Sequence, residues 1–283
     1  MKTGISVHFD FTPEAARASF SQLHTLGYDC ADLQTFVHTE TEWFSAPASE
    51  RLRRWEEIGR IARDCGISLS QTHGPWRYPP QDYTEEDRAE RFEKMCIALE
   101  GTAAVGAPCM AIHNIMPDGG ERNPDPERFM EMNRAFFARL IEKAKACGTV
   151  IALENMPFKN LILSTPEQVL GFVKEFDSPY FRVCLDTGHA AVFGISAGES
   201  VRLIGKETLA CLHVHDNDGA HDLHWVPYRG VVDWADFSLA LHEIGYEGSL
   251  SLETHVNAKL PPEVRPEWEK ALAATARYLA GKR

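Results

Sequence analysis

Short apolar runs alternate with longer amphipathic, helix-like stretches along the whole chain. A run of four to eight residues between turn residues is the pattern of a buried β-strand. Eight such runs occur: Gly4–Phe9, Cys30–Phe36, Ile67–His73, Pro108–His113, Val150–Glu154, Phe181–Asp186, Leu209–His215 and Ser249–Glu253. The alternation therefore predicts eight consecutive strand–helix units.

Capping signals mark several of the helices between these runs. Thr12 and Thr165 each precede a proline, which places a capping hydroxyl directly before a residue that suits the first helical turn. These signals predict helices over Thr12–Leu26 and Thr165–Phe176. Glycine stands where a helix is expected to turn into the next strand, at positions 27, 66, 106, 148 and 245.

Eight strand–helix units in 283 residues favour a closed parallel barrel over an open doubly wound sheet. No GxGxxG follows the first strand and no P-loop motif occurs, which weakens a nucleotide-binding alternative. No linker or low-complexity tract divides the chain. We therefore expect an α/β fold, one (β/α)8 TIM barrel domain over residues 1–283. Long loops at 37–50, 74–84, 114–126 and 216–232 follow strands, which is the catalytic face of a barrel.

Charge and hydropathy limit the classes of partner that the protein is expected to bind. The chain has 29 basic and 41 acidic side chains, a net charge of −12, which disfavours non-specific attraction to nucleic acid or anionic membranes. The first residues lack an apolar signal core, and no stretch approaches the roughly 20 apolar residues of a membrane span. We expect a cytoplasmic protein that binds neither nucleic acid nor membrane. A homo-oligomer remains open.

Residues that ligate metals recur where the predicted strands end. Six of them would converge on one rim of the barrel: His73, His113, Glu154, Asp186, His213 and Glu253. Converging ionisable groups are costly to desolvate unless they bind a cation or one another. The pattern therefore predicts a metal site at the carboxyl ends of the strands.

Four motifs in order resemble the xylose isomerase-like barrel superfamily, which includes sugar-phosphate isomerases, ketose 3-epimerases and endonuclease IV. They are LEN at 153–155, CLDTGH at 184–189, HVHDND at 213–218 and LET at 252–254. The resemblance implies one divalent ion, Mn2+, Mg2+, Co2+ or Zn2+, with the ligands Glu154, Asp186, His213 and Glu253. His213 is preferred to His215 because the family's histidine precedes an acidic residue by three. His189 resembles the residue that contacts a substrate oxygen.

Endonuclease IV extends the same frame to three zinc ions. The extra ligands there correspond to His73 and His113 with Glu154, and to His189, Asp222 and His224. This chain retains all of them, which keeps a zinc phosphodiesterase open as an alternative. It departs from the nuclease because ENMPFKN follows where the nuclease has a glycine-rich run, and AIHNIMPDG replaces a short His-Pro-Gly stretch. A sugar-acid or inosose dehydratase is a third alternative.

The favoured interpretation is a metal-dependent sugar or sugar-phosphate isomerase or epimerase of carbohydrate metabolism that acts through an enediolate. Glu154 and Glu253 would exchange the roles of general acid and base; alternatively both are ligands only and another residue is the base. Among the substrate contacts, His73 and His113 would line the sugar pocket, Trp76 would stack on the sugar, and Arg229 would hold a phosphate if one is present.

Overall fold

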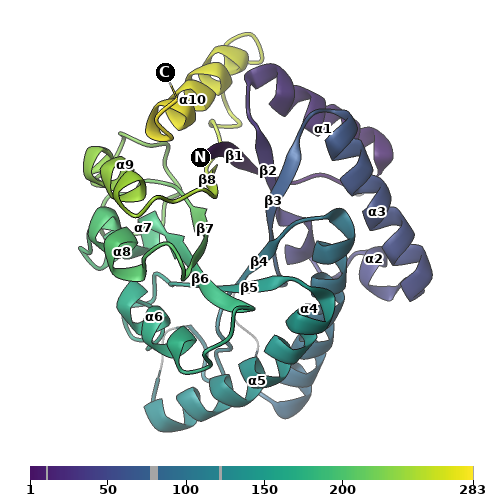
Figure 1. The fold of residues 1–283 in the computed structure, drawn as a ribbon, viewed down its shortest axis with the longest axis vertical. Helices are drawn as coiled ribbons and strands as arrows, with labels where there is room; N and C mark the ends of the chain where they lie inside the picture. The colour runs from purple at the N-terminus through teal and green to yellow at the C-terminus, as the bar shows by residue number, and fades with distance from the viewer. Residues whose placement is uncertain (11, 77–81, 121–122, 283) are drawn as a thin grey trace.

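Eight parallel strands form one sheet that curls into a barrel inside a ring of helices (Figure 1). The computed structural model describes residues 1–10, 12–76, 82–120 and 123–282. The strand order is β7-β6-β5-β4-β3-β2-β1-β8. The strands are β1 Lys2–Val7, β2 Cys30–Leu33, β3 Ser68–His73, β4 Cys109–Ile112, β5 Val150–Glu154, β6 Phe181–Asp186, β7 Leu209–His213 and β8 Ser249–Leu252. The predicted (β/α)8 TIM barrel is confirmed.

The barrel is nearly closed by contacts just beyond β7. The Val214 amide donates to the carbonyl of Ser251 at 2.9 Å, and the Glu253 amide donates to the carbonyl of Val214 at 3.0 Å. These bonds set the end of β7 beside the end of β8. His213 directly precedes Val214, and Glu253 makes one of the two bonds. The side chains of His213 and Glu253 therefore meet at the same rim.

The helices follow the strands in turn, as predicted. They are α1 Pro13–Leu26, α2 Glu42–Ser45, α3 Ala48–Asp64, α4 Glu85–Val105, α5 Pro126–Cys147, α6 Pro166–Lys174, α7 Thr187–Val192, α8 Ala197–Ile204, α9 Trp234–Glu243 and α10 Arg265–Leu279. Thr12 and Thr165 cap α1 and α6 by accepting backbone N–H bonds. Helix α6 ends at Lys174, two residues before the predicted end. Within the described ranges, no helix combines the length and apolar character needed to cross a membrane.

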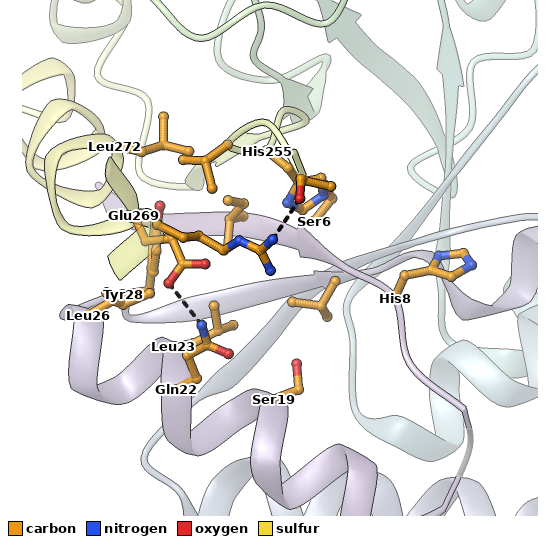
Figure 2. Close-up of a pocket in the computed structure, with 15 residues that line it drawn as sticks. Ser6, His8, Ser19, Gln22, Leu23, Leu26, Tyr28, His255, Glu269 and Leu272 are labelled. Atoms are coloured by element: carbon orange, nitrogen blue, oxygen red, sulfur yellow. Dashed lines mark hydrogen bonds between the residues drawn. The ribbon is translucent and has the colours of Figure 1, made fainter. Parts of the chain in front are cut away.

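The first and last helices meet beside β1 and complete the ring. The side-chain amide of Gln22 in α1 donates to the Glu269 carboxylate in α10 at 3.0 Å (Figure 2). Arg277 of α10 also donates to the Leu26 carbonyl at the end of α1, at 3.0 Å. A cavity of about 260 Å³ lies between these helices and β1, and Figure 2 shows the residues that line it.

Small side chains form a layer inside the barrel beneath the rim. Cys109, Ala111, Ala152, Cys184 and Cys211 are buried against one another. Four of them stand two residues before a metal-ligand candidate, so alternation along each strand puts them directly below it. This layer of small side chains therefore lies directly beneath the polar residues of the rim.

The second strand is shorter than predicted. The chain leaves β2 after Leu33 and forms a 3-10 helix, η1, over Gln34–Val37. Phe36 packs edge-on against Trp55 of α3, with ring centroids 5.4 Å apart, and this burial turns the chain outward from the barrel. The turn brings Gln34 over the rim, where its amide donates to the Glu253 carboxylate at 2.9 Å.

Candidate metal centre

Four predicted ligands lie together at the carboxyl ends of neighbouring strands. Glu154, Asp186 and His213 are the last residues of β5, β6 and β7, and Glu253 follows β8. One ligand atom from each lies within 4.8 Å of the others. His213 Nδ1 is 2.9 Å from Glu154 Oε1 and 3.4 Å from Glu253 Oε2. The fold thus gathers side chains that are up to 99 positions apart in sequence, from 154 to 253.

The electrostatics of this group favour a bound cation. Burial raises the pKa of Glu253, His213 opposes the rise, and repulsion from Glu154 and Asp186 adds to it. Burial also acts to raise the pKa of Glu154, but attraction to His213 and His113 outweighs it and holds that pKa well below its usual range. No described lysine or arginine lines the cavity above these carboxylates. Oxygen and imidazole donors in this number suit Mn2+, Mg2+, Co2+ or Zn2+.

Two further histidines contact Glu154, His113 from just after β4 and His73 from the end of β3. His113 Nε2 lies 3.2 Å and His73 Nε2 3.6 Å from Glu154 Oε2. Burial lowers the pKa of His113 to about 4, so its ring is neutral. Trp76 packs edge-on against His113, with ring centroids 4.3 Å apart. His73, His113 and Trp76 line one cavity of about 460 Å³ together with Glu154, Glu253 and His189.

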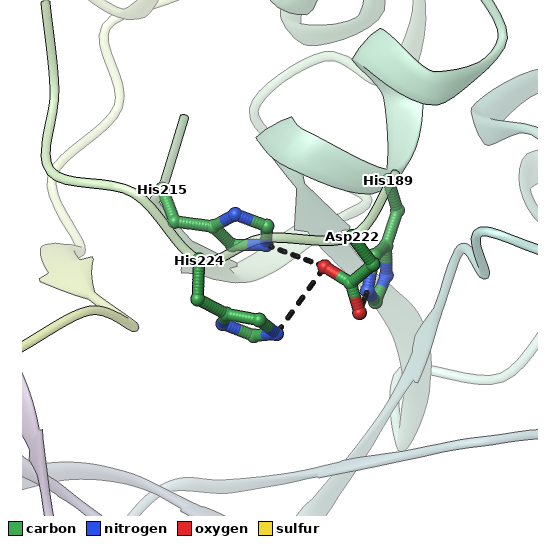
Figure 3. Close-up of side chains that lie close together, drawn as sticks. All are labelled: His189, His215, Asp222 and His224. Atoms are coloured by element: carbon green, nitrogen blue, oxygen red, sulfur yellow. Dashed lines mark hydrogen bonds and ion pairs between the residues drawn. The ribbon is translucent and has the colours of Figure 1, made fainter. Parts of the chain in front are cut away.

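A second cluster lies beside the first and consists of His189, His215, Asp222 and His224. Figure 3 shows the Asp222 carboxylate between the three imidazoles. Asp222 Oδ1 lies 3.3 Å from His224 Nε2 and 3.7 Å from His215 Nε2, and Asp222 Oδ2 lies 3.3 Å from His189 Nε2. Asp186 Oδ2, 3.0 Å from His215 Nε2, connects the two clusters.

The charges of the second cluster are coupled. Burial acts to lower the pKa of His189, but Asp186 and Asp222 outweigh it and raise that pKa to about 10. Burial likewise opposes the rise at His224, whose pKa is raised to about 9 chiefly by Asp222. In the metal-free protein both imidazoles therefore carry a proton at neutral pH. A metal ion would have to displace those protons.

His215 was missed by sequence reasoning, which treated it only as the rejected alternative to His213. The two are separated by one residue, so both can face the same side of an extended chain. The structure uses both: His213 belongs to the first cluster and His215 to the second. The spacing of the two histidines in the HVH motif was the sequence feature that could have identified His215.

Asp216 fixes the loop that carries Asp222 and His224. Its carboxylate accepts the backbone amides of Gly230 at 2.9 Å and Val232 at 3.1 Å, and the indole N–H of Trp234 at 3.0 Å. These bonds join the beginning of the 216–232 loop to its end. The acidic residue three positions after His213 therefore holds the loop in place and does not face the carboxylate cluster.

Arg229 lies apart from the other predicted substrate contacts. Its guanidinium group stacks over the Trp225 ring, 4.5 Å from the centroid, and it lines an adjoining cavity. His224 lines both cavities, so they meet at that side chain.

Comparison with known proteins identifies the family. The sequence profile of the xylose isomerase-like TIM barrel family matches residues 20–280, and the chain belongs to that family. It is 30% identical over 262 residues to the uncharacterized protein MJ1311 of Methanocaldococcus jannaschii, covering 89% of this chain and 83% of that one. It is 27% identical over 212 residues to the D-psicose 3-epimerase of Ruminiclostridium cellulolyticum, covering 71% and 68% of the two chains.

A solved structure shows the same fold. The crystal structure of a D-psicose 3-epimerase in the presence of D-fructose superposes with a TM-score of 0.78 at 20% identity, over 99% of this chain and all of that one. The similarity extends along the entire barrel.

Proposed function

We propose that this protein is a divalent-metal-dependent isomerase or epimerase that acts on a sugar or sugar phosphate through an enediolate. The observation that carries the proposal is the group of three carboxylates and one imidazole, within 4.8 Å of one another, below a cavity of about 460 Å³. The epimerase relatives support a carbohydrate substrate. A cavity of this size accommodates a monosaccharide.

Glu154, Asp186, His213 and Glu253 would hold the metal ion, as ligands of the kind that borderline and hard cations take. When bound, the ion supplies Lewis acidity next to the carbonyl of the sugar and so acidifies the neighbouring C–H bond. The remaining requirements, a base, an acid and a fixed substrate, fall to the protein side chains.

Glu154 and Glu253 are the acid–base pair of this proposal. Glu154 ends β5 and Glu253 follows β8, and both line the cavity. Their surroundings shift their pKa values in opposite directions, downward for Glu154 and upward for Glu253. Two carboxyl groups with separated pKa values are suited to the roles of base and acid. Glu154 would remove the carbon-bound proton, and Glu253 would return one on the opposite face.

The side chains along the cavity wall would position the sugar. His73, His113 and His189 would contact its oxygens, and Trp76 would stack on its apolar face. Arg229 lies in the adjoining cavity, so we propose that it holds a part of the substrate distant from the reacting carbon.

We further propose a second ion at Asp222 and His224, with His215 beside them. This cluster supports a second candidate function, a zinc phosphodiesterase similar to endonuclease IV. The wall of the main cavity argues for the sugar enzyme, because no described lysine or arginine is available there to bind a phosphodiester backbone.

The two candidates differ in the bond that they break. Epimerisation exchanges a carbon-bound proton with solvent, whereas phosphodiester hydrolysis breaks no C–H bond. We expect the metal-loaded protein in D2O to place deuterium beside the carbonyl of at least one compound in a panel of ketoses, ketose phosphates and inososes. We also expect it to leave a duplex with an abasic site uncut. Cleavage of the duplex without deuterium incorporation would establish the nuclease in place of the epimerase.

A further inference from the structure

The side-chain amide of Gln34 connects the rim carboxylate Glu253 with the buried carboxylate Asp32. Its nitrogen donates to Glu253 Oε1 at 2.9 Å and to Asp32 Oδ2 at 3.2 Å. An amide NH2 group has two N–H bonds, so it can make both contacts at once. Gln34 also lines the proposed sugar cavity, together with Glu253. One amide thus joins a residue of the barrel interior to a residue of the substrate cavity.

The backbone that carries Gln34 is anchored by a neighbouring aromatic residue. Gln34 begins η1, and Phe36 of the same 3-10 helix is fully buried. A Cβ atom added at Gly101 of α4 would lie 2.6 Å from the Phe36 ring, so that ring fits closely against the helix. Gln34 therefore extends over the rim from a fixed starting point.

The other end of the connection is fixed as well. Asp32 is fully buried, and its Oδ2 atom also accepts the side-chain amide of Gln71 at 3.3 Å. His213 Nε2 lies 3.4 Å from the same oxygen. Asp32 is thus held by groups from other strands, and it gives the Gln34 amide a stationary partner below the rim.

The two carboxylates of the proposed acid–base pair are held by different partners. Each oxygen of Glu154 contacts an imidazole, Oε1 that of His213 at 2.9 Å and Oε2 that of His113 at 3.2 Å. Among the described residues, Gln34 makes the only side-chain hydrogen bond to the Glu253 carboxylate. The loss of the Gln34 amide would therefore release Glu253 and leave both contacts of Glu154 in place.

We propose that Gln34 is a positioning residue that fixes the carboxyl group of Glu253 for proton delivery. The last torsion of a glutamate side chain has a broad preference, so a carboxyl group without a fixed partner points in many directions. This inference rests on the proposed function, in which a C–H bond breaks to Glu154 on one face and another forms from Glu253 on the opposite face. The substrate gains and loses one proton, and its oxidation state is unchanged. Gln34 would act on the second step only.

The fate of the enediolate in D2O tests the inference, with the metal-loaded protein and each ketose that the wild type accepts. Return of a deuteron by Glu154 gives labelled sugar of unchanged configuration, whereas delivery by Glu253 gives the labelled epimer. Gln34→Met keeps the length of the side chain and removes both N–H donors. We expect this variant to lower the ratio of labelled epimer to labelled unchanged sugar by about tenfold, measured by NMR, because a misplaced acid delivers its proton more slowly. Gln34→Asn, which is one methylene shorter, should change the ratio in the same direction.

Gln22→Met is the matched control, because the Gln22 amide also donates to a glutamate, Glu269 of α10, at 3.0 Å and away from the rim (Figure 2). It should keep the wild-type ratio. Metal affinity, measured by competition with a chelating dye, is the second readout. In Gln34→Met it should stay within about threefold of wild type, since every proposed ligand is retained and Gln71 still donates to Asp32.

Each other outcome overturns the inference in a different way. A wild-type ratio in Gln34→Met rejects the positioning role and leaves the proposed function intact. An equal loss of both labelled sugars means that Gln34 supports the site as a whole and not Glu253 in particular. A fall of tenfold or more in metal affinity means that Gln34 acts on the metal through Asp32. If the wild-type protein places deuterium in no sugar, both the proposed function and the inference are rejected.

Discussion

His213 Nε2 lies 3.4 Å from Asp32 Oδ2, and both side chains are fully buried in the barrel. The other ring nitrogen, Nδ1, faces Glu154 and Glu253. The imidazole thus stands between a carboxylate below the rim and the cluster on it. Such a partner sets which nitrogen of a ligand histidine carries the proton and which one meets a metal.

Replacing Asp32 should weaken metal binding without removing a ligand. Asp32→Asn keeps the size of the side chain but loses the charge that holds the Nε2 proton of His213. We expect the affinity for the first ion to fall by about 10- to 100-fold, measured by competition with a chelating dye. Asp29→Asn is the matched control, because Asp29 pairs with Lys282 and the Thr3 amide away from the rim. Equal affinity in wild type and Asp32→Asn would refute the orienting role.

Removing either member of the proposed acid–base pair should stop proton exchange. Glu154→Gln and Glu253→Gln are each expected to lower the rate of deuterium incorporation by at least a hundredfold, since general acid–base catalysis contributes about 10²–10⁴. Circular dichroism should show an intact fold, because the barrel is stabilised mainly by its apolar core. Glu175→Gln, which alters an exposed pair with Arg134, serves as control. Wild-type rates in both variants would show that the base is another residue.

The second cluster makes a prediction about metal stoichiometry. Asp222→Asn should lower the metal content of protein purified without chelators by one ion per chain, because Asp222 contacts all three imidazoles of the cluster. His221→Ala provides the comparison on the same loop, since His221 is exposed and pairs with Asp218 instead. Elemental analysis by mass spectrometry measures both. An unchanged metal content in Asp222→Asn would assign the cluster to substrate binding.

The raised pKa of His189 predicts how the stability of the metal-free protein depends on pH. The folded-state value of about 10 exceeds the ordinary value of 6.5, so the protonated ring stabilises the fold. That contribution is complete below about pH 6.5 and is lost as the pH rises towards 10. Each pH unit between the two pKa values contributes about 1.4 kcal/mol to the free energy of unfolding.

Urea unfolding in the presence of a chelator measures this dependence. From pH 6.5 to 10 the free energy of unfolding should fall more steeply for wild type than for His189→Gln. The comparison uses the slope with pH, because the variant also removes one imidazole partner from both Asp186 and Asp222 and is expected to be less stable throughout. Parallel slopes would show that His189 is neutral in the folded protein.

The barrel and its rim follow from local features of the sequence. Apolar runs with helix caps and turn glycines predict each strand–helix unit, and five glycines expected at helix ends indeed have positive φ. Parallel strands in a barrel bring all their carboxyl ends to one rim. For that reason the polar residues near the strand ends were enough to predict that a set of possible ligands meets at one rim, whereas the choice of Glu154, Asp186, His213 and Glu253 among them came from the resemblance to the family.

Relationships across the barrel were decided only by the tertiary structure. In the sequence, Asp32 is one polar residue within an apolar run. In the structure it contacts His213, which is 181 positions away. Trp268 is a partly exposed residue of α10, and only the packing of that helix brings it to the cavity that Trp225 also lines. A local pattern determines which element forms and which residues end it. Which side chains meet depends on strand register, barrel closure and loop path, and these are set by contacts between residues distant in sequence.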